Sequence, residues 1–268
     1  MLETKTGVLT RFGTTNVLPA RANHEARSIL GIKVCVFSKS DALDHLSWAI
    51  EQNHHIKLAF LNAHGANIAQ HDSAYKNDLE KFDVLADGVG VDIGSTINYG
   101  EKFPANLNGT DFIPALFAHL TQGAKIALFG SEPGVAEFAV ENLQARFPVH
   151  QFEVAGHGFL SRPAERKMLK HLAETRPDIL LVALGNPIQE RWIAEHCSKD
   201  NCTIAIGVGA FFDFAADSVP RAPNFIRKFR LEWAYRLWQE PRRMWKRYLI
   251  GNPLFILRSL KQKFSRNG

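Results

Sequence analysis

A carboxylate with possible catalytic use lies in the segment Ala86-Asp87-Gly88-Val89-Gly90, at the end of a short apolar run. There Asp87 could accept the proton of an attacking hydroxyl group as a general base, and the glycines would let a ligand or another backbone come close. An Asp-Gly pair after a strand also forms ordinary turns, so both interpretations stay open. The spacing of Gly88, Gly90 and Gly94 is GxGxxxG, which differs from the GxGxxG of dinucleotide-binding proteins and disfavours a nicotinamide oxidoreductase.

Polar side chains also follow other apolar runs. Asn62 could hydrogen-bond to a base edge or a sugar hydroxyl, or it could be a helix N-cap. Gln189 and Asp213 could contact a nucleotide base or ribose, or, for Gln189, serve only as a first-turn helix residue. The turn at Gly130 leads into a helix whose N-terminus could hold a diphosphate, although many α/β turns look the same.

A group of cationic residues near the C-terminus could also do chemistry. Arg236, Arg243 and Lys246 are spaced seven and then three residues apart, which places them on one face of a continuous helix. Such a face could neutralise a diphosphate. It could equally be a solvated helix surface.

Positive charge and aromatic residues are concentrated in the same tail. Residues 219–268 hold thirteen Lys and Arg against two acids, a net charge of +11, whereas the whole chain carries +5, so the preceding residues carry about −6. Three of the five tryptophans lie among these cations. This composition is typical of proteins that bind a bilayer interface. Nucleic-acid-binding proteins use it too, but no recognised nucleic-acid motif accompanies the tail, so we expect a membrane partner.

The elements that must position these residues alternate between strand and helix. Strand-like runs occur at residues 32–37, 56–61, 84–86, 125–129, 179–184 and 203–208. Helix-like spacing occurs at residues 41–52, 67–79, 111–122, 133–147, 163–175 and 187–196. This order predicts a Rossmann-like α/β fold with a largely parallel sheet flanked by helices, which binds ligands beyond the carboxyl ends of its strands.

The chain divides into three regions by this pattern. We expect an N-terminal extension at 1–30, an α/β domain that binds the ligand at 31–218, and a helical appendage at 219–268. Within the appendage, residues 222–264 read as consecutive helices broken near Pro241 and Pro253.

Bulk composition excludes several other classes of protein. With 46% hydrophobic and 22% charged residues the chain can bury a substantial core. Cys35, Cys197 and Cys202 lack metal-ligand spacing and are odd in number, so neither a disulfide framework nor a zinc site is expected, and a reducing compartment fits. Charges scattered through the first 30 residues argue against a signal peptide, and no apolar run approaches the roughly 18 to 20 residues of a membrane span.

Seven short segments, in this order, resemble the WecG/TagA/CpsF family of bacterial glycosyltransferases. They are Ala86-Asp87-Gly88-Val89-Gly90, Gly109-Thr110-Asp111, Leu128-Phe129-Gly130 with Pro133-Gly134, Gly185-Asn186-Pro187-Ile188-Gln189-Glu190, Gly207-Val208-Gly209 with Asp213, Arg221-Ala222-Pro223, and Leu231-Glu232-Trp233 with Arg236. Each segment is weak alone, but their shared order is hard to obtain by chance.

The resemblance implies transfer of a sugar from a UDP-sugar to a sugar on undecaprenyl diphosphate, with inversion and without a metal or other cofactor. It implies Asp87 as the base. The donor would be bound by Asn62, Gly109, Asp111, Gly130, Gly185, Gln189 and Asp213. The acceptor or its diphosphate would be bound by Arg221, Arg236, Arg243, Lys246 and Arg247. The sequence also lacks Asp-x-Asp, the usual device for holding a metal on a nucleotide diphosphate, so cations must stabilise the leaving UDP.

The resemblance further implies a protein at the cytoplasmic face of the plasma membrane that acts in exopolysaccharide or cell-surface glycan synthesis. Exposed aromatics in the tail could meet lipid or a second copy of the chain. This sequence departs from some relatives at Phe60, where they carry Thr, and at Asp217, where they carry Gly. The alternative is a non-catalytic membrane-associated module that binds a nucleotide or polyanion, and it predicts UDP binding without product.

Overall fold

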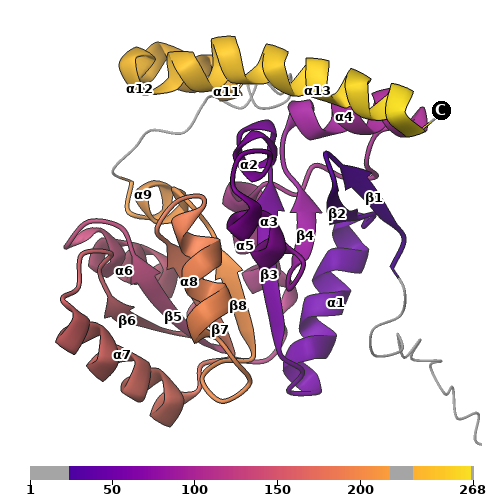
Figure 1. Ribbon diagram of the computed structural model, residues 1–268. Helices are drawn as coiled ribbons and strands as arrows, with labels where there is room; N and C mark the ends of the chain where they lie inside the picture. Colours follow the sequence, from indigo (N-terminus) through magenta and orange to yellow (C-terminus); the bar gives the residue numbers. More distant parts are fainter. Residues whose placement is uncertain (1–23, 218–231, 267–268) are drawn as a thin grey trace, which may run out of the picture.

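The computed structural model describes residues 24–217 and 232–266, and its centre is a parallel sheet (Figure 1). The sheet has six strands in the order β4-β3-β8-β7-β5-β6. The strands are β3 (Ile56–Leu61), β4 (Asp83–Ala86), β5 (Lys125–Gly130), β6 (Gln151–Gly156), β7 (Ile179–Ala183) and β8 (Ile204–Gly207). Every neighbouring pair is parallel, which confirms the predicted α/β fold.

Helices cover both faces of the sheet, so the central strands are apolar along their whole length. One face carries α2 (Ala63–Ala69), α3 (Ser73–Leu79), α4 (Val89–Tyr99), α7 (Arg162–Thr175) and α8 (Ile188–His196). The other carries α1 (Lys39–Glu51), α5 (Gly109–His119), α6 (Val135–Arg146) and α9 (Phe211–Ala215). Alternate strand residues enter the two cores, as in β7, where Leu180 faces one core and Leu181 the other.

Several elements differ from the sequence prediction. The run at 32–37 forms β2 (Ile32–Cys35), but β2 pairs antiparallel with β1 (Ala26–Ile29) in a separate hairpin. The predicted helix at 67–79 is two helices, because Asp72 caps a new one and accepts a hydrogen bond from Tyr75 N. β6 was not predicted, since it is a half-exposed edge strand with Gln151 and Glu153 in it. α4 was not predicted either, since Gly90 and Gly94 are poor helix formers.

Close packing explains the glycines of α4. A Cβ atom on Gly90 would lie 2.9 Å from the Cβ of Ala63 in α2, and one on Gly94 would lie 2.9 Å from Cζ of Phe255. Tertiary contacts that only glycine permits therefore override the low helix propensity of this segment.

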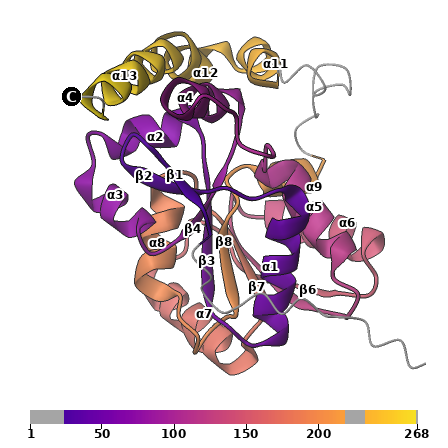
Figure 2. The same ribbon diagram turned by 90° about the vertical axis from the view of Figure 1, so that its right-hand side faces the viewer.

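The C-terminal helices lie across the carboxyl ends of β3 and β4, above α2 and α4 (Figures 1 and 2). They are α11 (Glu232–Gln239), α12 (Pro241–Trp245), a π-helical turn η1 (Lys246–Ile250) and α13 (Gly251–Arg266). The predicted break near Pro241 separates α11 from α12. Near Pro253 the chain stays helical. The π-helical bond from Gly251 N to Lys246 O lies two residues before this proline, which cannot donate.

Polar contacts fasten α13 to the body of the protein. Asn67 Nδ2 of α2 donates to Gly251 O at 2.7 Å, and Arg258 Nη1 donates to Asn67 Oδ1 at 2.7 Å. Gln262 pairs with the hairpin, where its Nε2 donates to Ser28 O at 2.7 Å. Phe255 of α13 is fully buried against α4. This helix is thus packed as part of the α/β body.

Candidate active site at the carboxyl edge of the sheet

Consecutive connections leave the carboxyl edge of the sheet toward opposite faces. β3 and β7 lead into α2 and α8 on one face, whereas β8 and β5 lead into α9 and α6 on the other. β3, β8, β7 and β5 are neighbours in that order. The connections that follow any two adjacent strands of this set therefore turn to opposite faces of the sheet. Open α/β sheets bind ligands at such switch points. The residues that follow these strands therefore form the candidate site.

Asp87 and Asn62 meet at the ends of two neighbouring strands. Asp87 N donates to Leu61 O at 2.9 Å, which extends the β3–β4 ladder by one residue and fixes the backbone of Asp87. Asn62 Nδ2 then donates to Asp87 Oδ2 at 3.4 Å. The same Asn62 caps α2, because its Oδ1 accepts from the N–H groups of His64 and Gly65 at 3.1 Å each. The N-cap interpretation of Asn62 is confirmed, and its amide also faces the predicted base.

The turn after Asp87 holds the start of α5 beside it. Gly88 has φ 89° and its N–H donates to Asn106 Oδ1 at 2.6 Å. Gly109 lets α5 begin against the core, since a Cβ there would lie 3.2 Å from the ring of Phe60. That ring is buried and packs edge-to-face on Phe112 with centroids 6.0 Å apart. The Phe60 side chain, which stands where some relatives carry Thr, thus fills apolar space in the core.

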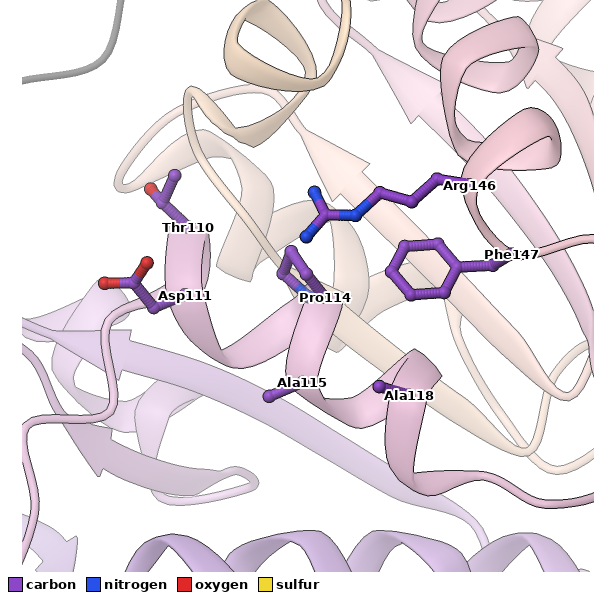
Figure 3. A pocket seen from close by; sticks show the side chains of 7 residues that line it. All are labelled: Thr110, Asp111, Pro114, Ala115, Ala118, Arg146 and Phe147. Atoms are coloured by element: carbon purple, nitrogen blue, oxygen red, sulfur yellow. The ribbon is translucent and has the colours of Figure 1, made fainter.

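Asp111 belongs to the first turn of α5 and lines a different surface feature. Its Oδ2 accepts from Asn108 Nδ2 at 3.1 Å, and its N–H donates to Asn108 Oδ1 at 3.0 Å, which is a reciprocal helix cap. A hollow of about 390 Å³ lies between α5 and the end of α6 (Figure 3). It is lined by Thr110, Asp111, Pro114, Ala115, Ala118, Arg146 and Phe147. The lining does not include Asp87, and contact of Asp111 with a donor stays a prediction.

Gln189 ties two strand-end turns together. It is 2% exposed, and its Oε1 accepts from Gly185 N at 3.2 Å and from Gly209 N at 2.9 Å. Its Nε2 donates to Glu190 Oε1 at 2.8 Å. Position 207 must be glycine for this arrangement, because a Cβ there would lie 2.8 Å from Gln189 Nε2. The turns after β7 and β8 are therefore held at a fixed spacing.

Asp213 connects the next pair of turns. Ser131 Oγ, which follows β5, donates to Asp213 Oδ1 on α9 at 3.3 Å. Gly130 has φ 123° and a Cβ there would lie 2.4 Å from Ala183 O, so only glycine allows this turn against β7. The turn after β6 joins the same group, because Gly158 N donates to Ser131 O at 2.8 Å. The sequence did not indicate that Ser131 would bond to Asp213, although the turn that contains Ser131 was predicted to lead into a helix.

One cation of the C-terminal helices, Arg247, lies close to the β3 end of this edge. Arg247 on η1 stacks on Tyr248 with 5.6 Å from Cζ to the ring centroid, and Lys246 Nζ lies 5.6 Å from the Trp245 ring. Burial, and then the charge of Arg247, lower the pKa of His64 to about 4. Since His64 is in the first turn of α2, Arg247 lies near the Asn62 cap. Sequence reasoning gave His64 no role.

The other predicted cations are only partly described. Arg236 lies on α11 and Arg243 on α12, but their side chains are not among those described. Arg221 lies outside the described residues. Their contacts with an acceptor or diphosphate stay predictions.

Comparison with known proteins identifies the family. Residues 27–268 match the description "Glycosyl transferase WecG/TagA/CpsF family". This chain belongs to that family. The match confirms the resemblance inferred from the seven segments, and the WecG/TagA/CpsF member described here is a glycosyltransferase.

Three relatives share one name, N-acetylglucosaminyldiphosphoundecaprenol N-acetyl-beta-D-mannosaminyltransferase. The protein from Bacillus spizizenii is 30% identical over 197 residues, which are 73% of this chain and 75% of the relative. The protein from Bacillus subtilis strain 168 is 30% identical over 194 residues, or 69% and 74% of the two chains. The protein from Staphylococcus aureus strain MW2 is 26% identical over 250 residues, or 91% and 95%.

A helix that spans a membrane needs about 20 predominantly apolar residues. Within 24–217 and 232–266, no helix of this WecG/TagA/CpsF member is long and apolar enough to cross a bilayer.

Proposed function

We propose that this glycosyltransferase moves a sugar from a UDP-sugar to a sugar carried on undecaprenyl diphosphate, with inversion and without a metal. The product would enter a bacterial exopolysaccharide or cell-surface glycan. The names of the relatives support the acceptor, because they specify N-acetylglucosamine on diphosphoundecaprenol. They also name a β-linked product, which requires inversion if the sugar leaves an α-linked nucleotide donor.

The observation that carries the proposal is the contact between Asn62 and Asp87 at one edge of the sheet, with Arg247 near the same strand end. Asn62 contacts Asp87, and Arg247 influences His64 two residues after Asn62. A carboxylate and a cation are thus placed near the same strand end, as a general base and a leaving-group stabiliser require.

The reaction is a single displacement. Asp87 accepts the proton of the acceptor hydroxyl as the hydroxyl oxygen bonds to the anomeric carbon of the donor. The bond from that carbon to the diphosphate oxygen breaks on the opposite side, and its electron pair leaves with UDP. Lys246 and Arg247 offset the negative charge that develops on the diphosphate. The hydrogen bond from Asn62 orients the carboxylate.

The turns after β5, β7 and β8 would hold the donor nucleotide. Gln189 and Asp213 connect these turns to one another, and the α/β switch points lie between them. This arrangement supports the donor-binding roles assigned to Gly130, Gly185, Gln189 and Asp213. Gly109 would act by holding α5 beside Asp87.

Peripheral attachment to the inner face of the plasma membrane is supported by the outer face of α13. Ile250 at the end of η1 and Leu254, Leu257 and Phe264 on α13 are exposed and recur at the spacing of one helix face. Lys261 and Lys263 are exposed beside them. Apolar side chains flanked by cations suit an anionic bilayer surface.

The test is a transfer assay with a panel of UDP-sugars and N-acetylglucosaminyl diphosphoundecaprenol in vesicles. The names of the relatives make UDP-N-acetylmannosamine the first donor to try. We expect a lipid-linked disaccharide of inverted anomeric configuration that forms equally well in the presence of a chelator. UDP binding without product from any donor would instead favour the non-catalytic binding module.

A further inference from the structure

A fully buried carboxyl group lies behind the donor side of the edge. Glu190, in the first turn of α8, has no exposed surface. Its Oε1 accepts from Asn186 Nδ2 at 2.6 Å and from Gln189 Nε2 at 2.8 Å, whereas its Oε2 has no hydrogen-bond partner. Two donors thus converge on one oxygen, whereas the other oxygen is buried without a hydrogen bond.

The surroundings of Glu190 offer it no compensating positive charge. From α3, the buried Tyr75 faces it, and the Tyr75 hydroxyl bonds to the side chain of Asn186. The nearby ion pair of Asp72 and Arg191 lies at the exposed rim. β7 and β8 present only apolar side chains, and Lys57 of β3 bonds to Ala194 O near the far end of α8. Among the described residues no cation pairs with Glu190.

Burial without a cation favours the neutral carboxylic acid. Burial is the main cause that raises the pKa of Glu190 to about 7. In the neutral acid, the carbonyl oxygen accepts from both amides and the proton sits on the second oxygen. In the anion, part of the negative charge lies on the second oxygen, which has no hydrogen-bond partner. This buried charge destabilises the hydrogen-bonded group of Glu190, Gln189 and Asn186.

Glu190 determines which way the Gln189 amide points. Only the amide nitrogen can donate to the carboxyl, so the amide oxygen must face the N–H groups of Gly185 and Gly209. The reversed amide would set its nitrogen against those two donors and its oxygen against Glu190 Oε1. The tie between the turns after β7 and β8 therefore depends on Glu190.

We propose that Glu190 is a positioning residue for the donor nucleotide, acting through Gln189 to hold the turns after β7 and β8 at the spacing that UDP requires. This inference rests on the proposed function, because it takes UDP as the ligand of these turns. It requires UDP to bind best when Glu190 is neutral.

The experiment compares UDP affinity at pH 6 and pH 8 by calorimetry in three full-length proteins. In the wild type we expect the affinity to fall about fivefold or more from pH 6 to pH 8, beyond the change due to UDP itself, because proton and nucleotide binding are linked. Glu190→Gln keeps an acceptor oxygen and cannot ionise, so it should show only the change due to UDP. Glu165→Gln is the matched control. Glu165 accepts from Trp192 of the same helix at 2.7 Å, and this variant should behave like the wild type.

Thermal unfolding supplies a readout that does not depend on the nucleotide. The folded pKa of Glu190 lies above its unfolded value, so the stability that it contributes at low pH is lost as pH rises through about 7. The melting temperature of Glu190→Gln, relative to that of the wild type, should therefore be higher at pH 8 than at pH 6. Gln189→Leu removes the tie itself and should weaken UDP binding at both pH values.

Three results would overturn the inference. One is a pH dependence of UDP affinity that is the same in Glu190→Gln as in the wild type. Another is loss of UDP binding in Glu190→Gln at pH 6, which would mean that the anion is the positioned form. If Glu190→Gln does not fold, unchanged UDP affinity in Gln189→Leu would contradict the proposal. Failure of the proposed function is distinguishable, since a wild type that binds UDP but makes no product leaves these comparisons intact.

Discussion

At the scale of single residues, one side chain can serve the fold and the chemistry together. Asn62 caps α2 with its oxygen and contacts Asp87 with its nitrogen. The helix N-terminus thus sets the rotamer of the side chain that contacts the proposed base. From the sequence, the cap and the ligand contact are alternatives, because one residue type suits both.

Replacing Asp87 with Asn should separate chemistry from binding. The amide keeps the shape of the carboxylate but cannot accept a proton, so turnover should fall by about 100-fold or more. The dissociation constant of UDP should change less than about twofold, since the donor turns lie on other strands. Rates from the transfer assay and calorimetry with UDP measure the two effects.

Asp83→Asn is the control for this variant. Asp83 starts the same strand and bonds to His45 Nε2 at 2.9 Å, away from the carboxyl edge. It should keep most of the wild-type turnover. Near-normal turnover in Asp87→Asn would show that another group takes the proton.

Burial of individual side chains marks the limit of sequence reasoning at this scale. Glu190 reads as an ordinary first-turn carboxylate, which the helix dipole favours in solvent. Nothing in the run from Gly185 to Glu190 shows that Tyr75, more than 100 residues earlier, closes over it. Asp87 is a candidate from sequence because it directly follows an apolar strand, and Gln189 because it lies at the helix start that comes after another such strand; both patterns are local in sequence.

At the scale of elements, the packing of α13 on α2 and α4 places η1, with Arg247, near the first turn of α2. Arg247 reaches the first turn of α2, and α13 continues directly from η1 along α2 and α4. The position of the C-terminal helices can therefore be tested through one histidine.

Replacing Arg247 with Gln should raise the pKa of His64. Loss of the positive charge removes one of the two causes that lower it, while burial, the larger cause, remains. The pKa should rise but stay below the ordinary value of about 6.5. An NMR titration of the imidazole measures the change. Lys261→Gln, on the outer face of α13, should leave it unaltered, and an unshifted pKa in Arg247→Gln would place η1 away from α2.

Replacing Gly94 with Ala should destabilise the joint between α4 and α13. Alanine gains about 1 kcal/mol of helix propensity over glycine. The new methyl group would lie 2.9 Å from Phe255 Cζ and 3.3 Å from Ser259 Oγ, both in fully buried residues. Overpacking of this kind costs about 1 to 3 kcal/mol, so the net free energy of unfolding should fall or at best stay level.

Gly251→Ala, at the start of α13 and facing Asn67 of α2, is the matched control. Its Cβ would meet neighbours only at 3.6 Å and beyond, so it should be neutral or stabilising. Chemical denaturation compares the two variants. A clearly stabilised Gly94→Ala would contradict the close packing of α4 on α13.

Strands were predicted correctly where both of their faces are buried, and the edge strand with exposed residues was missed. β7 and β8 are continuous apolar runs, so their strands were evident from sequence. β6 lies at the sheet edge and alternates weakly, and α4 begins with glycines whose purpose appears only against Ala63 and Phe255. The predicted parallel order also could not reveal that β2 pairs with β1 in a hairpin.

At the scale of the whole molecule, α13 has two faces with different partners. Phe255, Ser259 and Gln262 face the protein. Leu257 and Phe264 are 63% and 72% exposed on the other side. The overall charge imbalance was visible in the sequence, but which side chains face outward required the packing of α13 on α4.

Introducing acid on the outer face should release the protein from membranes. In the double variant Leu257→Glu and Phe264→Glu, binding to vesicles that contain anionic lipid should weaken about tenfold or more, because each buried apolar side chain contributes about 1.5 to 3 kcal/mol. Vesicle sedimentation measures the change. Phe138→Glu on α6, where the phenyl ring is 60% exposed, is the control and should bind as the wild type does. Unchanged binding of the double variant would assign membrane attachment to another surface.

The direct packing of α13 on α4 has a geometric consequence for the proposed reaction. α4 starts two residues after Asp87, so the helix that would rest on lipid is braced against the helix that follows the base. The distance between the bilayer surface and the carboxylate would then be fixed. For the proposed reaction, that separation must match the height of the hydroxyl on an acceptor with one sugar on its diphosphate, and the terminal hydroxyl of a longer glycan on the same lipid would stand farther from the membrane than the base. Product length would be limited to one addition by height above the membrane.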